Sequence, residues 1–427
     1  MGHSHGSAGA SPSMHGLHTC RNLLRLLETS NLVYSSWRAT MAEKVTLAIV
    51  GCGGIAGAHR EGLRKLWEAG IRDFEVIATV DIDRSRAEKM ADQVAQFQGR
   101  RPTPYQQLEE MLQAEKNLDA VDICSVHRNH HSLAIPCFQA GKHVTIEKPL
   151  ALTLKAGRRM LAAAEQAGTV FQVAENYRRA PEHRAIHWAV RQGDIGEIRM
   201  IFWLDVGERL WYWTWREHRM DAGGGWVLDG GVHFADLFRY HVGEVDTVAA
   251  RSHAFHPYRY GKPETLEDPI PVDVEDTVMA TLTFENGAMG QWTSVSAAPG
   301  KGFSQRILYG EHGSIDFGSG LKTRSGREES LQEMVARFRK AIGEDGWEQM
   351  FPHGVTDTIA TELWEFIQAV QGKMQVEING VEGYKDEAIC MALYESSWLN
   401  GSTVVVADVE AGAIANYQRD LDEAIGL

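Results

Sequence analysis

The chain has 427 residues, a formal net charge of −14 and 44% hydrophobic residues. This length suits two domains with separate cores, and the negative charge without a block of Lys or Arg argues against nucleic acid and anionic membranes as partners. No apolar run approaches the roughly 20 residues that span a bilayer, so we expect a small-molecule ligand. Five scattered cysteines without zinc-type spacing indicate free thiols in a reducing compartment, and we expect the cytoplasm.

Residues 1–40 differ in composition from the rest of the chain. His, Ser and Gly dominate this segment, and Glu28 is its only acidic residue. We expect it to be a disordered extension. An organelle-targeting segment, or an upstream stretch joined to a start at Met41, are the alternatives.

Between residues 41 and 167, short β-branched runs alternate with amphipathic segments. This alternation is typical of βαβ units on a parallel sheet, and therefore of an α/β fold. Gly141 is expected to end the helix before the last strand, and another helix is expected over 154–167. The predicted strands are 45–50, 74–80, 120–126 and 143–147.

After about residue 168 the pattern changes to longer strands and hairpins. Apolar and polar residues alternate from 277 to 295 on both sides of Asn286-Gly287, a strong hairpin signal. Residues 168–427 are therefore expected to form a second domain of α+β type with an antiparallel sheet. Amphipathic helices are predicted over 327–342 and 357–371.

The stretch AIVGCGGIAGAH lies between the first strand and the next helix, and it places Gly51, Gly53 and Ala56 in a G-x-G-x-x-A pattern. In a dinucleotide site these residues permit a tight turn, close approach of the pyrophosphate and close helix–sheet packing. Asp81 ends the second strand, where its carboxylate can accept hydrogen bonds from both ribose hydroxyls of NAD and would repel the extra phosphate of NADP. We predict a Rossmann domain over 41–167 that binds NAD, although Arg84 weakens the preference over NADP. A glycine turn that binds nothing is the alternative.

Lys148 follows the strand over 143–147 and precedes Pro149. Open α/β sheets bind ligands at the carboxyl ends of their strands, so a lysine there can reach a substrate hydroxyl and take part in proton transfer. Pro149 biases Lys148 away from helical geometry. We expect Glu147 to reach the same crevice and to support Lys148 by hydrogen bonds, and an ordinary surface lysine is the alternative.

A second candidate lies in the glycine-rich stretch 223–236. It leads into a predicted helix in which Asp229, His233 and Asp236 fall at i, i+4 and i+7 on one face. A histidine oriented by an acid is a usual proton relay, so we predict that Asp229 orients His233. A capping aspartate beside a structural histidine is the alternative.

Taken together, these motifs resemble the Gfo/Idh/MocA family, named for glucose–fructose oxidoreductase and inositol dehydrogenase. The resemblance covers roughly residues 44–400. It implies a Rossmann domain followed by an α+β domain with a large, open, mostly antiparallel sheet that often mediates oligomers. It also implies that Lys148 contacts nicotinamide and substrate, and that Asp229 and His233 form the acid–base pair. The resemblance rests on the glycine motif with His59, Asp81, AGKHVTIEKP (140–149), NYR (176–178), GDIGEI (193–198), WR (215–216), GGGWVLDGGVHFAD (223–236) and YGEHGSIDF (309–317).

One stretch departs from the family pattern. Where the family commonly has Thr-Pro-Asn-x-x-His after the fourth strand, this chain has Ser-Val-His-Arg-Asn-His over 125–130. Val126 and His127 thus replace the proline and asparagine that usually lie along the cofactor. His127, His130 and His131 could suggest a metal, but they have no carboxylate or cysteine at ligand spacing, so we expect none.

Aromatic residues are crowded just before and within the glycine run. Sugar rings offer C–H faces to aromatic planes, and their hydroxyls need polar partners such as Arg178, Arg216, His218 and Asp205 nearby. A hydrophobic core cluster is the alternative. The aromatic residues are Trp203, Trp211, Tyr212, Trp213, Trp215 and Trp226.

We therefore predict an NAD-dependent oxidoreductase that acts on a secondary hydroxyl of a sugar, glycoside or cyclitol, and that forms a dimer or tetramer. An NAD-dependent glycosidase that oxidises its substrate transiently, or a nucleotide-binding sensor, are the alternatives. The predicted catalytic residues are Lys148, Asp229 and His233. The predicted cofactor contacts are Gly51, Gly53, Gly54, Ile55, Ala56, Asp81, Ile82, Arg84, Ser125, Val126, His127, His130, Glu147 and Lys148. The predicted substrate contacts are Lys148, Asn176, Tyr177, Arg178, Trp215, Arg216, Asp229 and His233.

Overall fold

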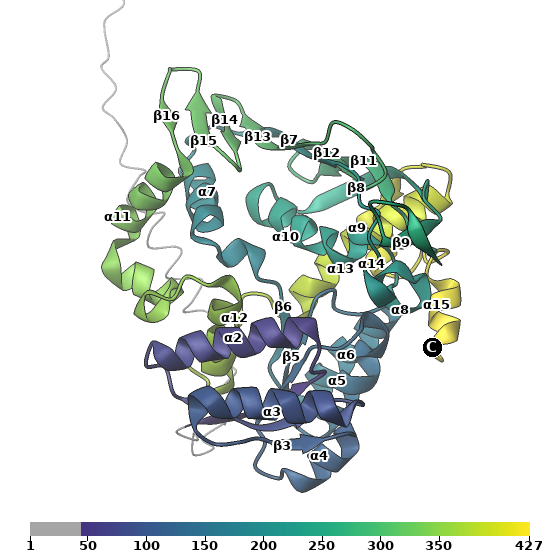
Figure 1. Cartoon of the computed structure of the whole chain (residues 1–427). Coiled ribbons are helices and arrows are strands. Elements are labelled where there is room, and N and C mark those ends of the chain that lie inside the picture. Colours follow the sequence, from purple (N-terminus) through teal and green to yellow (C-terminus); the bar gives the residue numbers. More distant parts are fainter. Residues whose placement is uncertain (1–43) are drawn as a thin grey trace, which may run out of the picture. The chain divides into compact units, whose positions relative to one another are not determined.

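The computed structural model of the protein describes residues 44–427 (Figure 1), so the extension predicted over 1–40 lies outside the described residues. A parallel sheet of six strands occupies the first part, in the order β3-β2-β1-β4-β5-β6. The strand order reverses between β1 and β4, which is where sheets of this type bind ligands. The strands are β1 (Val45–Val50), β2 (Phe74–Val80), β3 (Thr103–Tyr105), β4 (Ala120–Ile123), β5 (His143–Glu147) and β6 (Phe171–Ala174).

The parallel sheet is covered by helices, which explains why its strands are apolar along nearly their whole length. The helices of this part are α2 (Gly54–Glu68), α3 (Arg84–Gln98), α4 (Leu108–Ala114), η1 (His127–Asn129), α5 (His130–Gln139) and α6 (Leu154–Ala167). The strand predicted over 120–126 ends at Ile123, and η1 begins four residues later at His127. The division predicted at residue 167 falls one strand short of the end of this sheet, since β6 pairs with β5.

The second sheet has nine strands, in the order β16-β15-β14-β13-β7-β12-β11-β8-β17. All its neighbours are antiparallel except β7 and β12, which confirms a large, mostly antiparallel sheet. The predicted hairpin at Asn286-Gly287 joins β11 to β12, and Gly287 has a φ of 85°. The strands are β7 (Ile198–Val206), β8 (Val245–His253), β11 (Thr277–Phe284), β12 (Met289–Val295), β13 (Phe303–Gly310), β14 (Gly313–Asp316), β15 (Gly320–Thr323), β16 (Glu328–Glu329) and β17 (Val404–Val405), with β9 (Tyr258–Lys262) and β10 (Glu267–Pro271) in a separate hairpin.

The later helices join the two sheets. Helix α12 packs on α2 and adds Leu363 and Phe366 to the core of the first sheet, whereas α13 packs against α6, α10 and β8 (Figure 1). The helix predicted over 357–371 is confirmed as α12. The helix predicted over 327–342 begins at Leu331 behind a Ser330 capping box and continues beyond an interruption at Gly343. These helices are η2 (Tyr177–Arg179), α7 (Pro181–Arg191), η3 (Thr214–Glu217), α8 (Arg219–Ala222), α9 (Trp226–Asp229), α10 (Gly231–His241), α11 (Leu331–Met350), η4 (Pro352–Gly354), α12 (Thr358–Val370), α13 (Gly380–Trp398), α14 (Val406–Glu410) and α15 (Arg419–Ala424).

Among the helices between residues 44 and 427, none combines the length and the apolar character that a membrane crossing requires.

Candidate active site

The glycine loop between β1 and α2 has the geometry of a phosphate cradle. Gly51 has a φ of 85°, and a Cβ atom there would lie 2.6 Å from the Cys124 carbonyl oxygen, so the fold itself requires glycine. A Cβ atom at Gly53 or Gly54 would instead meet no atom of the described chain within 4 Å. Packing does not explain these two glycines, whereas close approach of a pyrophosphate to the backbone at the start of α2 does. The loop therefore fits a dinucleotide.

Asp81 fastens this loop to the end of β2. Its carboxylate accepts hydrogen bonds from the backbone N–H groups of Cys52, at 2.8 Å, and Asp83, at 2.9 Å. A carboxylate has about four lone-pair sites, so Asp81 keeps acceptor capacity for ribose hydroxyls. Beside it, Ile82 is 84% exposed, and Arg84 is paired with Glu88 at 3.0 Å. The other predicted cofactor contacts lie beside this loop in two segments. Ser125 and Val126 lie just after β4, and Ile55 and Ala56 belong to the first turn of α2.

Lys148 is held at the end of β5 by Asp229. Its Nζ donates to the Asp229 backbone oxygen at 2.6 Å and lies 3.7 Å from the Asp229 carboxylate. The same carboxylate oxygen faces the His127 Nε2, at 3.2 Å, and the Arg216 Nε, at 3.0 Å. Burial opposes ionisation of Asp229, but the charges of Lys148, His127 and Arg216 hold its pKa well below its usual range. Asp229 is thus a fixed counter-charge for Lys148 and Arg216, and His127 is a third partner of its carboxylate.

His127 and His130 are both buried, which corrects the prediction that they contact the cofactor. Both ring nitrogens of His127 face acceptor oxygens, the Ala222 carbonyl at 2.8 Å and the Asp229 carboxylate at 3.2 Å. His130 is fully buried against the carbonyl oxygens of Pro149 and Ser125. Burial and the charge of His127 lower the pKa of His130 to about 4, so this ring is neutral at pH 7.

Glu147 is also buried, at 6% exposure, which corrects the prediction that it reaches the crevice. It does support the strand end by hydrogen bonding, because its carboxylate lies 2.7 Å from the His59 Nε2, and the His59 Nδ1 lies 3.0 Å from Asp122. Burial opposes the charge on His59, but Asp122 raises its pKa well above the usual range. His59, Asp122 and Cys124 also bring three potential metal-ligand atoms within 4.8 Å of one another, a group that the sequence analysis missed.

His233 is oriented by Glu175 and not by Asp229, so the predicted pairing is wrong. The His233 Nδ1 lies 2.7 and 2.8 Å from the two Glu175 carboxylate oxygens, and the Tyr177 ring stacks on the imidazole at 3.9 Å. Burial opposes ionisation of Glu175, but His233 lowers its pKa. The helix predicted through 223–236 is broken at Gly230, so Asp229 and His233 lie on separate helices, α9 and α10.

Close packing requires glycine at this break. A Cβ atom at Gly230 would lie 2.6 Å from the Trp226 ring, and one at Gly231 would lie 2.5 Å from the Trp292 ring. The two glycines therefore let α9 and α10 pack closely on indole rings. Glu175 directly follows β6, just as Lys148 directly follows β5, so the argument that located Lys148 could also have located Glu175.

The remaining predicted substrate contacts divide into two groups. The Arg216 guanidinium is stacked between Trp213, at 4.8 Å, and Trp215, at 4.4 Å, beside Asp229. Arg178 is instead buried against Asp236 and Tyr240, and Asn176 donates to Thr358 Oγ1 at 2.8 Å. The prediction that Arg178 contacts the substrate is therefore corrected, because its guanidinium serves a buried ion pair.

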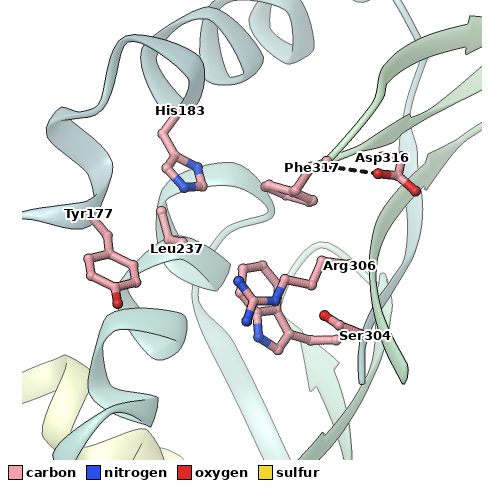
Figure 2. Close-up of a pocket in the computed structure, with 9 residues that line it drawn as sticks. Tyr177, His183, Leu237, Ser304, Arg306, Asp316 and Phe317 are labelled. Carbon is pink, nitrogen blue, oxygen red and sulfur yellow. Dashed lines mark hydrogen bonds between the residues drawn. The ribbon is translucent and has the colours of Figure 1, made fainter. Parts of the chain in front are cut away.

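A cavity of about 350 Å³ adjoins Tyr177 on the inner face of the second sheet (Figure 2). Trp203 lines it, whereas the sequence analysis did not identify Ser304, Arg306 and Asp316 as site residues because β13 and β14 lie far along the chain from the other motifs. The lining residues are Tyr177, His183, Trp203, Leu237, Ser304, Arg306, Asp316, Phe317 and Gly318.

The fold and the site together define a class of protein, a dinucleotide-dependent oxidoreductase in which a lysine follows one strand and a carboxylate that binds a histidine follows the neighbouring strand. Residues 45–175 match the family model described as "Oxidoreductase family, NAD-binding Rossmann fold", and residues 183–316 match the GFO/IDH/MocA C-terminal domain. The chain therefore belongs to the Gfo/Idh/MocA family of NAD-dependent oxidoreductases, which confirms the resemblance, the fold class and the cofactor.

Several relatives are named for their sugar substrates. The chain is 29% identical to the 1,5-anhydro-D-fructose reductase of Ensifer adhaerens, over 71% of this chain and 83% of that protein. It is also 29% identical to the levoglucosan dehydrogenase of Pseudarthrobacter phenanthrenivorans, over 67% of this chain and 80% of that protein. The WlbA dehydrogenase of Bordetella pertussis, solved with NADH and UDP-GlcNAcA, has a TM-score of 0.68 at 23% identity, over 86% of this chain and 99% of that one. At this identity the solved structure supports the fold alone.

Proposed function

We propose that the protein is an NAD-dependent dehydrogenase that oxidises a secondary hydroxyl of a sugar, glycoside or cyclitol. The observation that carries the proposal is the juxtaposition of Lys148 and the His233–Glu175 pair. Lys148 and Glu175 directly follow β5 and β6, which are neighbours in the sheet, and the carboxyl ends of such strands border the ligand crevice. The sugar-processing relatives support the substrate class.

The residues of the chain have distinct roles in this reaction. Glu175 holds the Nδ1 proton of His233, which leaves Nε2 to accept the proton of the substrate hydroxyl. Glu175 also stabilises the imidazolium that results. Lys148, fixed by Asp229, donates a hydrogen bond to the same hydroxyl oxygen and stabilises negative charge that develops there.

Gly53, Gly54 and Asp81 would hold NAD, which supplies the hydride acceptor when bound. Ile82, with its large exposed side chain beside Asp81, is suited to contact the adenine ring. The Trp213, Trp215 and Arg216 stack offers apolar planes and N–H donors to a sugar beside Lys148.

We also propose that the protein forms a homo-oligomer through the outer face of the nine-stranded sheet. Four large apolar side chains stay 40–61% exposed on this face, and strand pairing places them on the same side. Light scattering is expected to give a multiple of the 47.5 kDa chain mass, and a monomer would contradict the proposal. The four residues are Met200, Met279, Met289 and Phe303.

A reducing compartment, and so the cytoplasm, is supported by the described cysteines. Cys52, Cys124, Cys137 and Cys390 are all buried and unpaired. Cell fractionation is expected to recover the protein with cytoplasmic markers, and recovery from an oxidising compartment would contradict this assignment.

A substrate panel tests the function. The protein is incubated with NAD and individual sugars, glycosides and inositols, while NADH absorbance and product mass are followed together. NADH formed in proportion to a product two mass units lighter is the expected result. Sugar release without net NADH would instead identify a redox-neutral glycosidase. Unchanged ligand binding in Lys148→Ala and His233→Ala, with no turnover of any compound by the wild-type protein, would identify a sensor.

A further inference from the structure

A buried arginine of the β9–β10 hairpin, Arg259, has no role in the chemistry proposed above. Its side chain is 0% exposed, and its Nε lies 3.5 Å from the carboxylate of Glu217, the last residue of η3. We propose that Arg259 is a positioning residue, which holds Trp215 and Arg216 in place through Glu217 and so sets the affinity for the sugar. This inference rests on the proposed function, because Trp215 and Arg216 are substrate contacts of that site.

Glu217 is a buried acid between two guanidinium groups. It is 1% exposed, and its carboxylate forms ion pairs with Arg209 through Oε1 and with Arg259 through Oε2. The Arg259 Nη1 also donates to the carbonyl oxygens of His256, at 3.1 Å, and Tyr258, at 3.3 Å, which orients the guanidinium within the hairpin. Buried charges are strongly bound to their partners, since an unpaired charge is costly in the interior. Arg259 therefore ties the side chain that ends η3 to the hairpin.

Backbone hydrogen bonds hold the hairpin beside this loop independently of the Arg259 side chain. The Tyr260 N–H donates to the Leu210 carbonyl oxygen at 2.8 Å, and the Asp273 N–H donates to the Glu217 carbonyl oxygen at 3.2 Å. Removal of the Arg259 guanidinium is therefore expected to leave the hairpin in place and to release the carboxylate of Glu217. That carboxylate keeps Arg209 as a partner, so the variant does not leave an unpaired buried acid.

The Glu217 carboxylate is connected to the substrate contacts by a stack of guanidinium groups and indole rings. Arg209, which is paired with Glu217, lies 5.6 Å from the centre of the Trp213 ring. Arg216 lies 4.8 Å from the centre of the same ring and 4.4 Å from that of Trp215. Such contacts require each guanidinium to stay over its ring. A change in the position of the Glu217 carboxylate therefore shifts Arg209 and, through Trp213, Arg216.

The groups that act in hydride and proton transfer have other supports. Arg216 donates to the Asp229 carboxylate at 3.0 Å, but Lys148 also donates to the Asp229 backbone oxygen. His233 is held by Glu175. A displaced Arg216 is therefore expected to weaken binding of the sugar equally before and during the reaction. Loss of such uniform binding raises KM and leaves kcat unchanged.

Steady-state kinetics of Arg259 variants test the positioning role with a sugar that the wild-type protein oxidises. We expect Arg259→Met to raise the KM for the sugar about 10-fold, within the range that a small misplacement of a positioning group produces. The kcat should stay within about threefold of wild type and the KM for NAD should not change. Arg259→Lys retains a positive charge near Glu217, so its KM should lie between the two. Lys262→Met, an exposed lysine of β9 that pairs with Glu267 at 2.9 Å, is the control and should behave as wild type.

Circular dichroism of the tryptophans gives a readout that needs no turnover. Trp211 and Trp213 lie 5.7 Å apart with 66° between their ring planes. Indole rings at such short range couple their electronic transitions and give a paired band, whose intensity depends on their mutual orientation. We expect this band to weaken in Arg259→Met, because Arg209 packs on both rings, and to keep its intensity in Lys262→Met.

Three results would overturn the proposal for a variant whose melting curve is that of a folded protein. They are a KM for the sugar within about twofold of the Lys262→Met control, an equal rise in the KM for NAD, and an unchanged tryptophan band. If Arg259→Met fails to fold, Arg259→Gln, which also removes the charge, decides by the same measurements. The proposed function fails separately, if no sugar reduces NAD with the wild-type protein. The tryptophan band then still tests the link from Arg259 to the stack.

Discussion

Asp229 and Glu175 both border the crevice as buried, ionised carboxylates, yet their surroundings differ. The Asp229 carboxylate faces Lys148, His127 and Arg216, whereas Glu175 faces one imidazole and the Tyr177 N–H. A carboxylate shared among two cations and a further imidazole serves as a fixed counter-charge. A carboxylate with one titratable partner can stabilise a charge that appears and disappears during proton transfer. The two acids therefore divide the work, since Asp229 positions Lys148 and Glu175 supports His233.

Removal of the Lys148 ammonium should give the largest effect. Lys148→Met is expected to lower kcat by about 10²- to 10⁴-fold, the range for loss of a group that acts in proton transfer, because the developing negative charge loses its donor. NADH binding, followed by fluorescence, should persist because the glycine loop is unchanged. Lys155→Met, an exposed lysine on α6, is the control. A kcat for Lys148→Met within about threefold of the control would remove Lys148 from the chemistry.

Neutralisation of Glu175 should give the second-largest loss of kcat. Glu175→Gln keeps the shape and an acceptor for His233 but removes the charge that stabilises its imidazolium, so kcat should fall by about 10²- to 10³-fold. Glu165→Gln, exposed on α6, should behave as wild type. Steady-state kinetics measure both variants, and equal activity of the two would argue that His233 acts without this acid.

Neutralisation of Asp229 should lower the reaction rate less than neutralisation of Glu175. Asp229→Asn removes the attraction that holds Lys148 while the hydrogen bond to the backbone oxygen remains, so kcat/KM should fall by about 10- to 100-fold. A loss of kcat/KM larger than that of Glu175→Gln would contradict the different roles assigned to the two acids. Such a result would restore Asp229 as the partner of His233.

Replacement of His127 should have the smallest effect on the rate. His127→Asn introduces the residue common in the family and leaves Asp229 with two cations, so we expect less than about a tenfold change in kcat/KM, the scale of one altered hydrogen bond to a charged group. Kinetics and melting temperature measured together separate a local effect from unfolding. A loss as large as that of Lys148→Met would show that the His127 ring is essential.

The stability of the folded protein at acid pH should also depend on Glu175. Because the pKa of Glu175 is lowered in the folded protein, its contribution to stability is present above the ordinary glutamate pKa and is lost as pH falls through the folded value. Denaturant unfolding of Glu175→Gln should therefore depend less on pH in the acid range than that of wild type. A steeper dependence would contradict the assigned ionisation.

Local patterns predicted much of the fold. The alternation of β-branched runs and helices located β1, β2, β5 and α6, since each depends on a short segment and its periodicity. The packing of α12 on α2 could not be foreseen, because no local pattern encodes a contact between residues about 300 positions apart. The end of the first sheet was missed because β6 is a short strand beyond the last helix of the βαβ pattern.

The site could be predicted to the same extent as the fold, because local motifs located some of its residues but not those that distant segments bring together. Lys148 and His233 were located by strand-end and motif arguments, and the glycine loop by its spacing. The partner of His233 was assigned to the nearest acid on an assumed continuous helix, which Gly230 interrupts. The true partner, Glu175, directly follows β6 and lies 58 residues earlier in the chain. Arg306 lies on β13 and becomes part of a cavity only through strand pairing with Trp203.

The pH dependence of kcat/KM tests the central claim most directly, measured side by side for wild type, Glu175→Gln and Asp229→Asn with a substrate from the sugar panel. Loss of a negative charge beside an imidazole lets it release its proton at lower pH. If the two acids divide the work in this way, the acid limb of the kcat/KM profile moves to lower pH in Glu175→Gln. In Asp229→Asn the acid limb keeps its position, and only the maximal kcat/KM falls. An acid limb that moves in Asp229→Asn and stays fixed in Glu175→Gln would contradict it.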